Sequence, residues 1–144
     1  MISSSRSGGI VKQCVDALHD EGSLGTKDPV LVSGAGEKSL RLLIGQEGEA
    51  LWPFPRPGTS LWDVAAADAL LSAIGGKLTD RLGQRIDYSE TRIGSENDTG
   101  VVAASSIALH DACIKAYHLI EPPCSSMITA STALATIGDT KHCQ

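Results

Sequence analysis

Asp63 belongs to one of three stretches in this chain whose residue types could bind a phosphate or a metal ion. It follows Trp62 where an apolar helix is expected to begin, beside backbone N–H groups that have no partner within a helix. A carboxylate in this place either caps the helix or holds a cation, and the residues alone leave both roles open. Asp63 is therefore a candidate metal ligand with a structural alternative.

A glycine turn, residues 34–39 with the sequence GAGEKS, precedes an earlier helix. It is not a phosphate-binding P-loop, because Glu37 separates the glycine from the lysine, and Ser39 stands where a dinucleotide fingerprint has its third glycine. Small residues still let the backbone approach a ligand, helix N–H groups attract anions, and Lys38 adds a charge. The turn indicates an anion site at Gly34 and Lys38; the alternative is an ordinary helix start with a solvated lysine.

The serines near the start of the chain form the third stretch. Ser5 and its neighbours either hold phosphate oxygens or help to cap a helix that begins after Ser7. In a parallel α/β sheet the carboxyl ends of the strands share one edge, where ligands gather. This rule predicts that Ser5, Gly34, Lys38 and Asp63 converge.

Other reactive residue types lack a motif that marks them as catalytic. Cys14 and Cys113 fall on apolar helix faces, which favours a role in core packing. His110 and Asp111 are expected to be exposed helix residues. No local Ser-His-Asp or Cys-His arrangement is present.

The bulk composition narrows the class of protein. The 144 residues fit one domain, and a net charge of -5 with 12 lysines and arginines argues against general binding to nucleic acid or to a membrane surface. The four cysteines form no CxxC pair, and no apolar run approaches the roughly 18 residues of a membrane span. We expect a soluble cytoplasmic protein with reduced thiols.

Strand and helix patterns alternate along the chain, which predicts an α/β fold with a layered sheet, mixed and mostly parallel, flanked by helices. The expected strands are residues 29–33, 49–54, 77–80 and 100–104. The expected helices begin after Ser7, at the glycine turn, at Asp63 and after Ser105 or Ser106, the last running to His118. Their predicted buried stripes include Leu40, Leu43 and Ile44 in the second helix and Val64, Ala67, Leu70, Leu71 and Ile74 in the third.

The stretch LWDVAAADALLSAIGGKLTD, from Leu61 to Asp80, resembles the C-terminal signature of the inositol monophosphatase superfamily of magnesium-dependent, lithium-sensitive phosphatases. The resemblance implies that Asp63 ligates catalytic Mg²⁺. GAGEK and the Ser-Arg-Ser start are most similar to the 3'(2'),5'-bisphosphate nucleotidase branch, which implies that Ser5, Gly34 and Lys38 contact a bisphosphorylated nucleotide. That branch usually has a histidine where this chain has Gly8.

The resemblance covers residues 2 to 118 and implies a C-terminal lobe, residues 1–118, followed by a tail, residues 119–144. The family's Glu-Glu and Asp-Pro-x-Asp-Gly-Thr metal motifs do not occur in this chain. We therefore expect the catalytic groups in a missing N-terminal lobe and little activity from this chain alone. The implied substrate is 3'-phosphoadenosine 5'-phosphate (PAP), with an inositol phosphate as the alternative. A non-catalytic phosphonucleotide-binding module is the alternative of another class.

Overall fold

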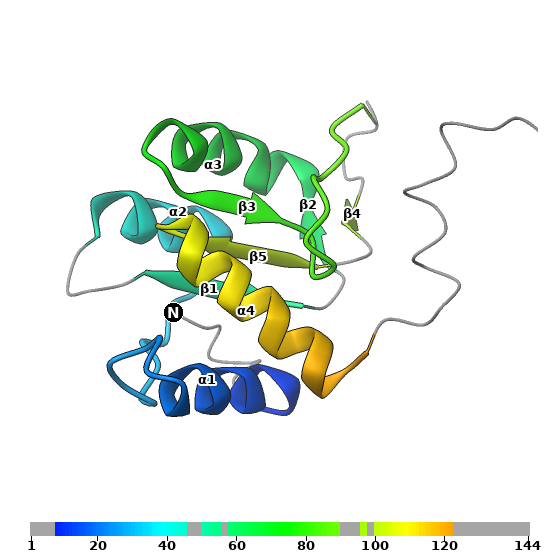
Figure 1. The fold of residues 1–144 in the computed structure, drawn as a ribbon. Helices are drawn as coiled ribbons and strands as arrows, with labels where there is room; N and C mark the ends of the chain where they lie inside the picture. The colour runs from blue at the N-terminus through cyan, green and yellow to red at the C-terminus, as the bar shows by residue number, and fades with distance from the viewer. Residues whose placement is uncertain (1–7, 46–49, 56–57, 90–95, 98–99, 123–144) are drawn as a thin grey trace, which may run out of the picture.

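The computed structural model describes residues 8–45, 50–55, 58–89, 96–97 and 100–122 (Figure 1). Its helices are α1 (Ile10–Asp20), α2 (Ala35–Ile44), α3 (Leu61–Ala73) and α4 (Ile107–Ile120). Its strands are β1 (Leu51–Phe54), β2 (Thr59–Ser60), β3 (Lys77–Thr79), β4 (Glu96–Asn97) and β5 (Val101–Ala104). The expected helix cap at Ser7 lies outside the described residues.

The main sheet has three strands in the order β1-β5-β3, and both pairings are antiparallel. The expected α/β class is confirmed, but the expected mostly parallel sheet is wrong for the described strands. Strand-helix-strand connections do give β1 and β3 the same direction. Strand β5, however, lies between them and runs the opposite way. A second, two-stranded sheet pairs β2 with β4 and was not expected.

Helices cover both faces of the main sheet, so the core has two halves (Figure 1). Side chains of β5 alternate between them: Val102 and Ala104 face the half with α1 and α4, while Val101 and Ala103 face the half with α2 and α3. All four are fully buried, and their small size lets both helix layers approach the sheet closely.

The packing of α1 against α4 confirms the core role expected for two cysteines. Cys14 and Cys113 are fully buried, and their sulfur atoms lie 3.6 Å apart as free thiols. The hydrogen bond with Cys14, together with burial, raises the pKa of the Cys113 thiol, so it stays protonated at neutral pH.

Two predicted elements differ from the structure. Residues 29–33 form no strand; only Leu31 makes an isolated bridge. In α2 the predicted stripe is wrong for Leu40 and Ile44, which are exposed, whereas Leu43 packs against the core as predicted. The buried residues of the helix are Lys38, Ser39 and Leu42. The polar residues Lys38 and Ser39 therefore occupy buried positions that the prediction had given to leucine and isoleucine.

Helix α3 begins two residues earlier than predicted and buries a narrower stripe. Ser60 is its N-cap, and the buried residues are Val64, Ala67 and Leu71, whereas Leu70 and Ile74 are exposed. Gly75 and Gly76 end the helix as predicted, and Gly75 adopts a φ of 86° that favours glycine. None of the described helices is long and apolar enough to span a membrane.

Candidate functional site

The start of α2 brings Gly34 and Lys38 into contact. Gly34 is the N-cap, with a φ of 81° that glycine adopts without strain. Lys38 lies one turn into the helix, and its side chain reaches back so that Nζ donates a hydrogen bond to the Gly34 carbonyl at 3.3 Å. The ammonium group therefore lies at the mouth of the helix, where the first backbone N–H groups have no intrahelical partner.

Trp52 of β1 lies beneath this ammonium group. Lys38 Nζ is 5.5 Å from the centroid of the Trp52 ring, and only 5% of Lys38 and 2% of Trp52 are exposed. A buried cation needs compensating partners, and an aromatic face is one of them. The alternative interpretation of Lys38 as a solvated surface lysine is therefore wrong.

Asp63 lies in the first turn of α3, three residues after its N-cap, Ser60. It is not the N-cap residue, so that version of its structural role is wrong. Its side chain is partly exposed, and no described residue forms a hydrogen bond or ion pair with its carboxylate. A carboxylate in this place interacts favourably with the positive end of the helix dipole, and its oxygen atoms are available to bind a cation.

Lys38 and Asp63 lie on two helices that pack against each other. Helices α2 and α3 contact each other over one face of the sheet, so Lys38 and Asp63 occupy the first turns of neighbouring helices. The shared edge of a parallel sheet, on which the expected convergence depended, is absent from the described strands. Ser5 lies outside the described residues.

The described residues provide one candidate metal ligand here rather than a complete set. No group of three or more His, Cys, Asp or Glu side chains in the described ranges could hold a metal ion. Mg²⁺ often takes one or two protein carboxylates and fills its octahedron with water and substrate phosphate oxygens. Asp63 could thus supply one ligand to Mg²⁺, and the remaining oxygen ligands would have to come from other groups.

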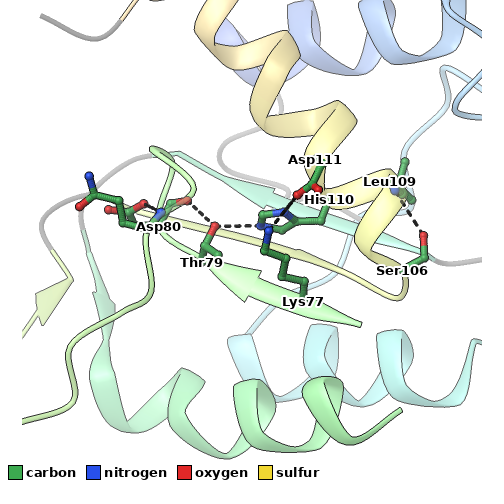
Figure 2. A network of polar contacts seen from close by, with 8 residues as sticks. Lys77, Thr79, Asp80, Ser106, Leu109, His110 and Asp111 are labelled. Carbon is green, nitrogen blue, oxygen red and sulfur yellow. Dashed lines mark hydrogen bonds and ion pairs between the residues drawn. The ribbon is translucent and has the colours of Figure 1, made fainter. Parts of the chain in front are cut away.

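A polar network between β3 and α4 was missed from the sequence (Figure 2). Thr79 Oγ1 lies 2.8 Å from His110 Nε2, and His110 Nδ1 lies 3.0 Å from Asp111 Oδ1. Lys77 Nζ forms an ion pair with the same Asp111 oxygen at 2.9 Å. The expectation of an exposed His110 is wrong, because none of its surface is accessible; Asp111 is exposed as predicted.

The order hydroxyl, imidazole, carboxylate resembles a nucleophilic relay, but its burial assigns it a structural role. Thr79 is only 2% exposed, so its oxygen cannot reach a substrate. Burial lowers the pKa of His110, and the Asp111 hydrogen bond opposes this effect. The helical spacing of His110 with Cys113 and Tyr117 is the sequence signal that could have predicted its burial.

An open groove of about 440 Å³ lies between α4 and the turn after β3. Leu82, Ile114 and Leu119 supply apolar walls, while Lys115 and His118 add polar groups. Because α4 and α2 pack with opposite halves of the core, the groove and the Lys38 turn are separate features.

The fold and these residues define a class of protein: a layered α/β unit. In it, the start of α2 could bind an anion, and the first turn of the neighbouring helix α3 carries a carboxylate. The chain belongs to the inositol monophosphatase family, whose sequence profile matches residues 4–118. That match includes Gly34, Lys38 and Asp63.

Individual relatives are named 3'(2'),5'-bisphosphate nucleotidase 1. The mouse protein is 36% identical over 101 residues, covering 69% of this chain and 30% of the relative. The Dictyostelium discoideum protein is 38% identical over 96 residues, or 67% of this chain and 28% of the relative. The human protein is 34% identical over 99 residues, 69% of this chain and 29% of the relative. The chain thus spans less than a third of the length of these relatives.

Proposed function

We propose that this chain forms part of a metal-dependent phosphatase that hydrolyses a phosphomonoester of a small bisphosphorylated substrate. The proposed substrate is PAP, which would give AMP and inorganic phosphate. The observation that carries this proposal is the similarity to named bisphosphate nucleotidases over about two thirds of the chain.

In this proposal the start of α2 binds a substrate phosphate. The backbone N–H groups after Gly34 face an anion, and the Lys38 ammonium supplies positive charge beside them. Ser5 is a further substrate contact. Asp63 holds Mg²⁺, which supplies electrostatic stabilisation of the transferring phosphoryl group.

Residues 1–118 are proposed as a C-terminal lobe and residues 119–144 as a tail. The other metal ligands and the groups that activate water would come from a lobe that corresponds to the unmatched part of the relatives. One carboxylate does not make a multi-metal site, so we propose that this chain alone is inactive.

Two alternatives remain in view. An inositol phosphate would suit the same anion site, and one relative with 40% identity over 60 residues is named inositol monophosphatase 3, from Danio rerio. A non-catalytic phosphonucleotide-binding module is favoured by the lack of a three-residue metal cluster among the described residues.

Calorimetric titration of the 144-residue chain with PAP and with myo-inositol 1-phosphate, each with and without Mg²⁺, tests the binding site. We expect PAP binding that Mg²⁺ strengthens and that Lys38→Ala weakens about tenfold or more, since a charged hydrogen bond contributes about 1.5–3 kcal/mol. Lys12→Ala is the control, because Lys12 is an exposed lysine on α1.

Phosphate release by the full-length gene product with Mg²⁺ tests the reaction. Release from PAP would support the nucleotidase, and release from the inositol phosphate alone would favour that alternative substrate. PAP binding without Mg²⁺ dependence, together with no phosphate release, would favour the binding module. The absence of both binding and phosphate release would refute the proposed function.

A further inference from the structure

Trp52 and Lys38 come from different elements but meet at one point of the fold. Trp52 is the second residue of β1, and its ring belongs to the core half between the sheet and helices α2 and α3. Lys38 Nζ lies over that ring at 5.5 Å from its centroid. The same ammonium group therefore contacts the start of α2, through the Gly34 carbonyl, and the sheet, through the Trp52 ring.

Packing fixes the orientation of the indole ring. Trp52 is 2% exposed and packs among apolar side chains, and its Nε1 has no hydrogen-bond partner in the described part of the chain. A buried N–H without a partner is costly, so a tryptophan here brings a disadvantage that an aliphatic side chain would avoid. The π face offers a compensating property, because its negative electrostatic potential attracts a cation.

We propose that Trp52 is a positioning residue for the substrate-phosphate site, an inference that rests on the proposed function of Lys38. The ring holds the ammonium group at the start of α2, in a place that excludes most water. A phosphate monoester at the N–H groups after Gly34 then meets a cation already in place, and the low local polarity strengthens their attraction.

Fluorinated tryptophans test this inference, because fluorine weakens the π face with little change in shape. The chain carries Trp52 and Trp62, so a Trp62→Phe background leaves position 52 as the one labelled site. The proteins with tryptophan, 5-fluorotryptophan and difluorotryptophan are compared by the acylation rate of Lys38, followed by peptide mass spectrometry. Lys12, paired with Asp16 on α1, is the internal control.

We expect Lys38 acylation to become faster by about three- to tenfold across the series, while Lys12 stays constant. PAP affinity should fall in parallel. Trp52→Leu should show the largest change and Trp52→Phe an intermediate one, with circular dichroism used to verify folding. If Trp52→Leu does not fold, the fluorinated series still decides.

The outcomes separate this inference from the proposed function. A Lys38 acylation rate that does not depend on fluorination would overturn the positioning role, whatever the chain binds. A fluorination-dependent rate without any PAP binding would support ring control of Lys38 and refute the proposed phosphate site. Affinity and rate that change together support both.

Discussion

The Thr79 hydroxyl oxygen lies 2.8 Å from His110 Nε2 in the core between β3 and α4. The hydroxyl has one proton, which either reaches the Asp80 carbonyl at 2.8 Å or the imidazole. If the neutral ring carries its proton on Nδ1 and donates it to the Asp111 carboxylate, then Nε2 is an acceptor and the Thr79 hydroxyl donates to it. The Asp80 carbonyl then keeps the Gly83 N–H at 3.1 Å as its donor. Thr79 thus favours neutral His110 in one tautomer.

Stability should depend on the protonation of His110. Burial lowers its pKa below the ordinary 6.5, so the unfolded chain binds more protons as the pH falls past that value. The contribution of neutral His110 to the free energy of unfolding should have its full value above pH 6.5, and the free energy of unfolding should decrease from pH 6.5 toward 5. Urea denaturation at pH 7.5, 6.5 and 5.5 measures this change.

His110→Gln is the control for that titration, and it should flatten the profile between pH 7.5 and 5.5. Asp111 also has a lowered pKa, mainly through its hydrogen bond to His110, but its contribution is lost only below its ordinary value of 3.8. Stability that stays level or rises as the pH falls to 5.5 would contradict the burial of a neutral His110.

Thr79→Val should destabilise the fold because it keeps the side-chain shape and removes the partner of His110 Nε2. A buried polar atom without a partner costs about 1–3 kcal/mol. The comparison is Thr59→Val, since Thr59 is also buried but its hydroxyl bonds to no described residue. Chemical denaturation measures both variants, and equal losses would remove the special role of Thr79.

Ser106→Ala should destabilise α4. Ser106 is the N-cap, and its Oγ accepts the Leu109 N–H at 3.3 Å. Loss of such a cap costs about 0.5–2 kcal/mol. Ser105→Ala should change little, because the Ser105 backbone N–H, rather than its side chain, bonds to Ala50. Thermal unfolding of both variants tests this difference, and a larger loss for Ser105→Ala would contradict it.

Gly76→Ala should be strongly destabilising, because a Cβ there would meet the Ala104 carbonyl oxygen at 2.7 Å and the Leu71 side chain at 3.2 Å. Both neighbours belong to packed elements, so we expect a loss of about 2 kcal/mol or more. Gly36→Ala is the matched control and should not destabilise the fold, since nothing lies within 4 Å of its added Cβ and alanine favours a helix. Unfolding curves should separate the variants; similar stability would refute close packing at Gly76.

Asp63→Asn should weaken Mg²⁺ binding in the presence of PAP, because it removes the charge while retaining the shape. The fold should lose only about 0.3–1 kcal/mol through the helix dipole. Calorimetry measures binding, and Asp28→Asn removes a charge from an exposed loop residue as the control. Unchanged Mg²⁺ affinity in Asp63→Asn would exclude Asp63 as a ligand.

The sequence by itself determined the features that depend on local patterns. The glycine-started α2, a serine cap before α4, the β3 and β5 strands and the burial of Cys14 and Cys113 follow from caps, periodicity and turn residues close in the chain. The structure chose Ser106 over Ser105 as the cap and brought the two thiols together. The similarity of Leu61 to Asp80 to a phosphatase signature likewise identified the family.

Tertiary structure alone decided the features that depend on which elements become neighbours. Strand β5 inserts between β1 and β3, and this makes the sheet antiparallel. Trp52 lies beneath Lys38, and this contact decides between the two interpretations of Lys38 that the sequence left open, in favour of a buried cation. Thr79 gives His110 its partner across 31 residues of sequence. Periodicity predicts the face of a helix or strand, but the burial of a polar side chain depends on a partner that only the packed chain supplies.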